Sequence, residues 1–329
     1  MVRDCTQEEQ TRQYTDAEGN EKEIYVPKAD CPDEELFKCG ISAGLNFSKY
    51  QNIPVKVTGE NIPKHIEKFE DAGLRPLLME NIKKSGYTIP TPIQKYGIPI
   101  VQSARDMMGC AQTGSGKTAS FLIPIINDLI ASNADSNSGS RASPQCLIVT
   151  PTRELANQIY GEARKFCVGS VLKCRVAFGG TSSSFQNNRL IQGCNILVAT
   201  VGRLLDFVGK SWINFENIKY IVLDEADRML DDGFMPEVEK IMADEKLPSK
   251  ESRQTLLFSA TFSDEIQEAC QQFLRDDYLF TTVGMIGGVC TDVTQEFIKV
   301  EQFDKRDKLD EILQDPDRNP LDRTLGKTS

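Results

Sequence analysis

The sequence predicts an α/β fold in which helices cover both faces of a mostly parallel sheet. Three observations support this prediction. Short apolar runs alternate with amphipathic runs between residues 146 and 274, a glycine-rich loop at 111–118 follows a short apolar run, and an acidic motif at 224–227 ends another. Regular alternation of strand and helix is the pattern of a parallel sheet with helices packed on it.

The expected elements follow in chain order. A helix is expected around 74–82, a rigid segment shaped by prolines at 87–99, a strand at 106–111, a helix at 119–130 and an exposed loop at 131–145. Further strands are expected at 146–150, 173–178, 196–200, 219–223 and 254–258, each followed by a helix, at 154–166, 183–191, 202–208, 236–242 and 263–274. Residues 279–300 are expected to add up to two strands, and 305–313 a last helix.

The loop after the first strand has the composition of a phosphate-binding loop. Glycines at 114 and 116 let backbone N–H groups turn toward phosphate oxygens, Lys117 adds a positive charge, and the Thr118 hydroxyl can ligate Mg²⁺. The helix that follows points its positive end at the bound anion. The general motif has Gly where this chain has Ala111. A surface glycine turn is the alternative, which the flanking strand and helix make less favoured.

The acidic motif supplies the other half of such a site, 107 positions after Lys117. Its strand delivers Asp224 and Glu225 at a carboxyl end, where open parallel sheets bind ligands. Asp224 is expected to hold Mg²⁺ through water, and Glu225 to orient or deprotonate a water beside the terminal phosphate. An acidic helix start favoured by the helix dipole is the alternative. Together the two motifs predict an ATPase site.

Composition excludes several other classes of protein. The chain has 329 residues, 40% hydrophobic and 26% charged, which is ordinary for a globular protein of about two domains. It shows no basic-then-apolar leader and no long apolar run, so we expect no membrane span, and a cytoplasmic location. The ten cysteines form no C-x-x-C pair and His65 is the single histidine, which excludes zinc sites of paired cysteines and metal sites of several histidines.

Charge does not decide whether nucleic acid is a partner. The net charge is −10, but residues 1–50 hold 6 basic and 11 acidic side chains, whereas residues 51–300 hold 26 and 29. The central part is nearly neutral and permits a local basic groove. Several strands end in polar residues: Pro151, Thr152, Arg153, Gly179, Gly180, Thr200, Gly202 and Arg203. Such groups can hold a phosphodiester backbone without reading bases, although turn chemistry and helix capping explain each of them equally well.

With these motifs in place, the chain resembles the first RecA-like domain of DEAD-box RNA helicases, a three-layer P-loop NTPase fold. The segment from Gly86 to Gln94 resembles the family's adenine-recognition segment, and Phe69 stands 17 positions before Gly86, as is usual in the family. Residues 46–59 and 203–208 are most similar to the Vasa type within the family, and the Belle type is the alternative.

The resemblance implies ATP and Mg²⁺ as cofactors. Gln94 is then expected to hydrogen-bond adenine, and Phe69 or Tyr87 to stack near it. The alternatives are that Gln94 is only a polar residue in a first helical turn and that Phe69 is a core anchor. The remaining nucleotide contacts are expected from Gln112, Thr113, Gly114, Ser115, Gly116, Lys117, Thr118 and Glu225, with Thr118 and Asp224 toward the metal. Ser259 and Thr261 are expected to couple this site to RNA through Asp227.

The resemblance also implies single-stranded RNA, bound independently of its sequence, as the partner. The expected RNA contacts are Pro151, Thr152, Arg153, Gly179, Gly180, Gln186, Arg189, Thr200, Gly202 and Arg203. Val201 stands where the family usually has Pro, which frees a backbone dihedral and adds an N–H donor in a loop expected to grip RNA. Ser263 replaces another common Pro and is expected to cap a helix.

The expected domain plan has three parts: a flexible acidic segment at 1–45, an ATP-binding RecA-like domain at 46–300 that includes the adenine segment 69–94, and a truncated linker or tail at 301–329. The family's second RecA-like domain, with its arginine finger, is not found in the sequence. An arginine finger is worth about 10³–10⁵ in rate, so we expect this chain alone to hydrolyse ATP slowly.

The sequence therefore leaves three functions open. The first is an ATP-dependent RNA helicase that opens duplexes locally when paired with a second RecA-like domain, in the cytoplasm or in perinuclear germ granules with their protein partners. The second is a nucleotide- and RNA-binding fragment or scaffold without turnover. The third, a P-loop ATPase that acts on something other than RNA, is disfavoured by the adenine segment and the strand-end motifs.

Overall fold

The computed structural model describes residues 10–15, 21–26, 32–38, 53–132, 141–231, 233–261, 263–284 and 297–314. The chain divides into two compact units, Met1–Gly288 and Val289–Ser329, which are treated separately below. The second unit contains helix α12 (Lys305–Gln314), close to the predicted 305–313. The first unit contains the sheet and the candidate site.

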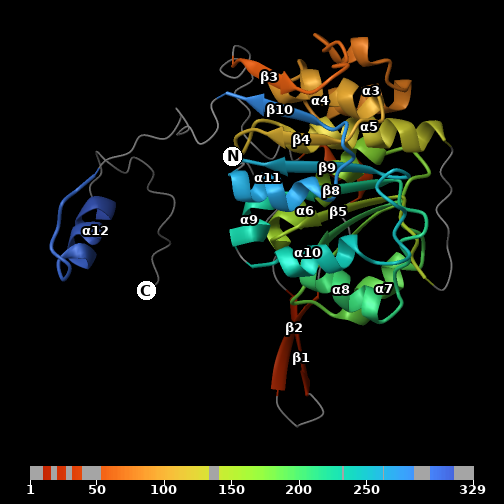
Figure 1. The fold of residues 1–329 in the computed structure, drawn as a ribbon. Helices are drawn as coiled ribbons and strands as arrows, with labels where there is room; N and C mark the ends of the chain where they lie inside the picture. The colour runs from red at the N-terminus through yellow and green to blue at the C-terminus, as the bar shows by residue number, and fades with distance from the viewer. Residues whose placement is uncertain are drawn as a thin grey trace. The chain divides into compact units, whose positions relative to one another are not determined.

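Within the described residues, eight strands form one sheet in the order β3-β10-β4-β9-β8-β5-β7-β6 (Figure 1). Their bounds are β3 (Val55–Thr58), β4 (Met107–Cys110), β5 (Cys146–Thr150), β6 (Cys174–Ala177), β7 (Ile196–Thr200), β8 (Tyr220–Asp224), β9 (Gln254–Ser259) and β10 (Leu279–Val283). All neighbours are parallel except the edge pair β3 and β10. The central strands are buried on both faces, which explains why the sequence shows continuous apolar runs there.

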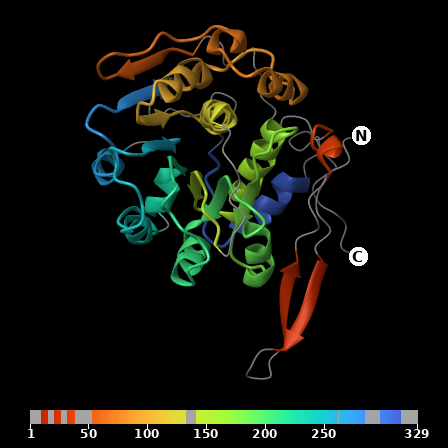
Figure 2. The ribbon, with the colours of Figure 1, turned by 90° about the vertical axis from the view of Figure 1, so that its right-hand side faces the viewer.

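Helices cover both faces of this sheet, which confirms the predicted three-layer fold (Figures 1 and 2). One face packs against α3 (Pro76–Lys84), α4 (Pro92–Gln102), α5 (Lys117–Ala131) and α6 (Arg153–Cys167). The other packs against α7 (Ser183–Leu190), α8 (Val201–Gly209), α9 (Ala226–Asp231), α10 (Met235–Met242) and α11 (Asp264–Gln271). Successive strand residues such as Met107 and Met108 therefore enter opposite cores.

Several elements differ from the prediction. Helix α4 lies where a proline-shaped segment was expected, because Pro92 in the first turn gives up an N–H that has no helical partner, and Thr91 and Gln94 form a capping box. Strand β3 was not predicted. Of the two strands expected in 279–300, the described residues contain β10, while 297–300 form no strand and 285–296 lie outside the described residues.

The ends of the chain and the 131–145 loop were also predicted only in part. Strands β1 (Gln10–Thr15) and β2 (Glu21–Val26) form an antiparallel hairpin, followed by the short helix α1 (Asp33–Leu36), in a region where no regular element was predicted. In the expected exposed loop, Ala142 is fully buried and bridges Ile213. The tail after 314 lies outside the described residues.

Candidate nucleotide site and RNA groove

The glycine-rich loop connects β4 to α5 and depends on its glycines. Gly114 and Gly116 have φ values of +80° and +91°, which side chains with a Cβ rarely adopt. A Cβ on Gly116 would also lie 2.5 Å from Nε2 of Gln94. The loop is therefore held tightly between the start of α5 and the capping box of α4.

This loop offers groups that suit a phosphate. The Lys117 side chain is 8% exposed, and its Nζ donates a 2.7 Å hydrogen bond to the Ala111 carbonyl oxygen. Ser115 is 4% exposed, and its Oγ lies buried without a hydrogen-bond partner among the described residues. Thr118 is half-buried in the first turn of α5. A buried ammonium and an unsatisfied hydroxyl at a helix N-terminus fit an anionic ligand.

The acidic motif lies at the carboxyl end of β8, two strands from β4 in the sheet. Asp224 is 2% exposed, and burial raises its pKa to about 6, with Lys117 opposing and Glu225 adding to the rise. Its Oδ1 accepts from the Glu225 backbone N–H at 3.0 Å. Glu225 itself has a left-handed φ of +57°, an energetically costly conformation for a residue with a Cβ, and it pairs with Arg228 at 3.1 Å.

Asp227 connects this motif to the end of β9. Its Oδ2 accepts from the backbone N–H groups of Ala260 and Thr261 and from the Thr261 hydroxyl, at 3.0–3.2 Å. Ser259 Oγ donates to the Thr261 carbonyl oxygen at 2.5 Å. Burial opposes ionisation of Asp227, but hydrogen bonds from Ser259 and Thr261 outweigh it and lower its pKa. The residues expected to act together in coupling are thus in contact.

The side chains of Phe69 and of the adenine segment are more deeply buried than the sequence suggested. Gln94 is fully buried; its Oε1 accepts from Thr91 N–H at 3.0 Å and its Nε2 donates to the Gly116 carbonyl at 3.1 Å. Phe69 and Tyr87 are 2% and 5% exposed and meet edge to face. This burial favours the core-anchor alternative for Phe69 and speaks equally against stacking by Tyr87, because stacking on a base needs an uncovered face. Glu162, which bonds Tyr87, was not singled out from the sequence; its position on the buried stripe of α6 was the available signal.

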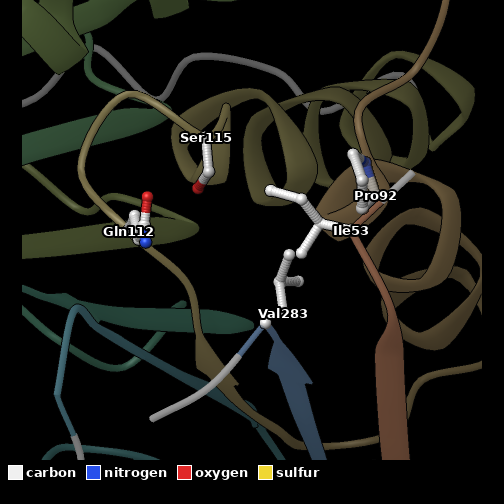
Figure 3. Close-up of a pocket in the computed structure, with 6 residues that line it drawn as sticks. Ile53, Pro92, Gln112, Ser115 and Val283 are labelled. Atoms are coloured by element: carbon white, nitrogen blue, oxygen red, sulfur yellow. The ribbon is translucent and has the colours of Figure 1, made fainter. Parts of the chain in front are cut away.

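A small pocket opens beside the phosphate loop. Figure 3 shows the Ser115 hydroxyl and the Gln112 amide on one side of it, and Ile53, Pro92 and Val283 on the other. These apolar side chains come from the start of α4 and from the β3–β10 edge of the sheet. An apolar wall opposite two polar groups is the usual lining of a small-molecule site.

A second, open hollow lies over the ends of β5, β6 and β7, and we call it the RNA groove after the contacts that the sequence predicts there. Its lining contains six of the ten residues expected to contact RNA: Pro151, Arg153, Gly179, Thr200, Gly202 and Arg203. Glu154, Val201, Asp206 and Phe234 complete it. Thr152 caps α6 next to the groove by accepting from Leu155 N–H at 3.3 Å, and Gly180 follows Gly179 with a φ of +81°.

The two remaining expected contacts are not part of the groove's lining. Gln186 is 5% exposed and bonds Phe178, Thr181 and Arg203, so it supports the Arg203 side chain. Arg203 also donates to the Thr181 carbonyl at 3.0 Å. Arg189 is half-buried, with an Nη2 3.4 Å from the Tyr160 hydroxyl, and burial lowers its pKa. Neither Gln186 nor Arg189 lines the groove.

Val201 does not lie in a flexible loop. It is the first residue of α8, its side chain is 1% exposed in the core, and Thr200 precedes it as N-cap. The expected freedom of its backbone is therefore wrong, because the helix fixes it. Ser263 is confirmed as a cap, since its Oγ accepts from Ile266 N–H at 3.4 Å.

None of the described helices is long and apolar enough to cross a membrane. Among the described residues, no cluster of three or more His, Cys, Asp or Glu side chains could hold a metal by itself. Any magnesium here would need ligands from phosphate and water besides Asp224 and Thr118, which is how Mg²⁺ is usually bound at nucleotide sites.

Comparison with known proteins decides the family. A model of the DEAD/DEAH box helicase family matches residues 91–269, more than half of the chain. The chain belongs to this family. The fold matches the crystal structure of the yeast DEAD-box splicing factor Prp28, with a TM-score of 0.65 and 33% sequence identity. The match covers 71% of this chain and 55% of that one. The sheet and its helices are thus the RecA-like fold of a DEAD-box helicase domain.

The similar curated proteins are of the type expected from the sequence. The human protein named probable ATP-dependent RNA helicase DDX4 is 50% identical over 310 residues, covering 91% of this chain and 42% of that protein. ATP-dependent RNA helicase vasa from Drosophila melanogaster is 50% identical over 293 residues, covering 89% of this chain and 43% of its own length. The chain therefore spans less than half the length of these relatives.

Proposed function

We propose that this chain binds ATP with Mg²⁺ at the ends of β4 and β8 and single-stranded RNA in the groove over β5, β6 and β7. The observation that carries the proposal is that both proposed sites lie at the same edge of the sheet. Because these strands are parallel, the buried Lys117, the carboxylate of Asp224 and the RNA groove all lie at the carboxyl ends of one sheet. The names of the DDX4 and vasa relatives support the same pair of ligands.

Each residue of the nucleotide site has a role in this proposal. Lys117 exchanges its bond to Ala111 for phosphate oxygens, and Ser115 gives its hydroxyl a partner. Asp224 and Thr118 hold the magnesium, which neutralises phosphate charge when bound. Glu225 orients the attacking water. The cavity beside Gln112 takes the adenosine end, with Gln94 at its back holding the loop in place.

In the RNA groove the contacts are made to the sugar-phosphate strand. Arg153 and Arg203 supply positive charge, and the exposed backbone at Gly179, Gly180 and Gly202 supplies N–H groups. These groups carry no base information, so binding is independent of sequence. Local duplex opening is assigned to the pair of this domain with a second RecA-like domain, whose arginine finger would supply most of the hydrolysis rate.

Calorimetry and fluorescence polarisation test this proposal on the full chain. Titration with ADP and with AMP-PNP, both with Mg²⁺, is expected to release or absorb measurable heat, and labelled U12 and a mixed 12-mer of RNA are expected to bind equally. ATP turnover is expected to be slow and to disappear in Glu225→Gln. Absence of nucleotide binding would refute the ATP site. Tight binding of both ligands without any RNA-stimulated turnover would instead favour the non-catalytic scaffold.

We also propose a cellular setting. The proposed location is the cytoplasm, with germ-granule proteins as partners, and the identity of about 50% with DDX4 and vasa supports it. A fluorescent fusion expressed in germ cells is expected to collect in perinuclear granules. Uniform nuclear fluorescence would contradict this setting without affecting the two ligand sites.

A further inference from the structure

Three buried polar side chains join the adenine segment to helix α6. Tyr87 donates its hydroxyl to Oε2 of Glu162 at 3.3 Å, and Lys165 donates to Oε1 of the same carboxylate at 2.8 Å. Each of the three residues is 5% exposed. Burial, and then the neighbouring Glu162, raise the pKa of Tyr87 far above its usual range, so the phenol stays a donor. We call these residues the α6 cluster.

One side of the α6 cluster leads to the phosphate loop. Tyr87 and Gln94 belong to the same short segment, and Gln94 binds the Gly116 carbonyl directly. The capping box between Thr91 and Gln94 fixes the start of α4 against that loop. A shift of Gly116 on nucleotide binding would therefore displace the segment that carries Tyr87.

The other side leads to the RNA groove. Helix α6 begins at Arg153, which lines the groove, and nine residues separate Arg153 from Glu162, which is about 14 Å along a helix axis. An uninterrupted helix transmits a shift along its length. The carbonyl oxygens of Phe166 and Val168 at its far end are held by Asn81 of α3, at 3.0 and 2.8 Å.

The packing around Tyr87 leaves little room for it to move independently. Its ring lies 6.4 Å from that of Phe69, edge to face, and 5.8 Å from that of Phe166. A buried ion pair is weak evidence for stability, because apolar side chains of similar volume are often as good or better. The ion pair at Glu162 thus calls for a role other than holding the fold together.

We propose that the α6 cluster is a positioning device that couples the phosphate loop to the RNA groove, separately from the contacts that Asp227 makes with Ser259 and Thr261. The inference rests on the proposed function, since it needs both ligands. Tyr87, Glu162 and Lys165 touch neither ligand in it. They set the position of Arg153 and of the N-terminus of α6 according to the state of the phosphate loop.

The test is a thermodynamic cycle on the full chain. The Kd of labelled U12 RNA is measured with and without saturating AMP-PNP and Mg²⁺. The coupling ratio is the Kd without nucleotide divided by the Kd with it. A ratio of about 5 or more is expected for the unmodified chain. Tyr87→Phe keeps the ring but removes the hydroxyl, and it is expected to bring the ratio toward 1, by about twofold or more, with each ligand alone binding within twofold of the unmodified chain.

A second variant and a control separate coupling from stability. Glu162→Gln combined with Lys165→Met removes both charges at similar volume, and it is expected to reduce the ratio as Tyr87→Phe does. Ile241→Val, at a buried residue of α10 that lines neither the pocket nor the groove, is the control; a mild core truncation there should lower the thermal midpoint and leave the ratio unchanged.

The outcomes are distinct. If the unmodified chain couples the ligands and both variants keep its ratio, the α6 cluster has no coupling role while the proposed function stands. If the ratio follows the thermal midpoint and Ile241→Val lowers it as well, the role is structural and the inference fails. If the unmodified chain binds both ligands without coupling, the inference is overturned and the proposed function stands. If it binds nucleotide but no RNA, the inference fails together with the RNA part of the proposed function.

Discussion

The nucleotide half and the RNA half of the sheet edge hold their charges in opposite ways. At the nucleotide half, Lys117 and Asp224 are 8% and 2% exposed, and the carboxyl is so deeply buried that its pKa rises to about 6. At the RNA half, the Arg153 side chain is 42% exposed and lies beside Glu154. Arg203 is more enclosed but is already bound to carbonyl and amide oxygens.

This difference shows where ligand binding gains its free energy. Buried charges without full compensation are costly, so a ligand that neutralises them relieves a cost already present in the empty protein. The arginines of the groove already have acidic partners, so under the proposed function RNA has to compete with Glu154 and Asp206 for them. We therefore expect nucleotide binding to depend on single residues and RNA binding to be spread over many.

The largest expected effect tests the buried charge directly. The pKa of Asp224 is raised from 3.8 to about 6, so in metal-free buffer its contribution to stability is present below pH 4 and is lost as the pH rises through 6. Since one pKa unit corresponds to about 1.4 kcal/mol, the loss is about 3 kcal/mol. Urea unfolding of the unmodified chain should weaken by that amount between pH 4 and 7 relative to Asp224→Asn. Parallel pH profiles of the unfolding free energy for the two proteins would show that the ionised Asp224 carboxylate does not destabilise the fold.

The next effect concerns the other buried charge. Lys117→Ala removes a hydrogen-bond donor to phosphate, and charged hydrogen bonds of this kind are worth about 1.5–3 kcal/mol, so the Kd for ADP should rise about 10- to 150-fold. The control is Lys219→Ala, an exposed lysine paired with Asp128 at 2.7 Å, which should leave the Kd unchanged. Calorimetry measures both. Equal losses in the two variants would remove the distinction between buried and exposed charges.

A smaller effect is expected for single arginines of the groove. Arg203→Ala should raise the Kd for U12 about 5- to 10-fold, and the more exposed Arg153→Ala about 2- to 3-fold, because each removes one of several phosphate contacts. Each variant should also lower the slope of log Kd against log salt by about 0.7. Polarisation titrations at several salt concentrations measure this. A 100-fold loss from either change would mean that RNA binding is not spread over the groove.

The smallest effect is expected at the start of α8. Val201 has the first helical position, where Pro is well tolerated, and Thr200 before it has the extended backbone, φ −82° and ψ 146°, that a following Pro requires. Val201→Pro removes one N–H at the groove, so the Kd for RNA should rise about twofold or less, and the unfolding free energy should change by about 1 kcal/mol or less. A loss of RNA binding above tenfold would assign that N–H a dominant contact.

The places of the local motifs were predictable from the sequence. The glycine-rich loop, the acidic motif and the Ser263 cap depend on neighbours a few positions away, and the structure has the loop between β4 and α5, the acidic residues at the end of β8 and the cap at the start of α11. The strands from 146 onward were predictable for the same reason, since burial on both faces leaves a continuous apolar run. Helix α4 was missed because its prolines suggested interruption, whereas Pro92 occupies a first turn that tolerates it.

The sequence by itself determined the fold class and the chemistry of the phosphate loop, because glycine, lysine and carboxylate at fixed spacing act through short-range geometry. Only the tertiary structure decided that Phe69, Tyr87 and Gln94 are buried, that Gln186 and Arg189 do not line the groove, and that Tyr87 meets Glu162, 75 positions later. Burial and partners of this kind arise where helices from distant segments pack on one sheet, and no local pattern of residues specifies which of them will meet.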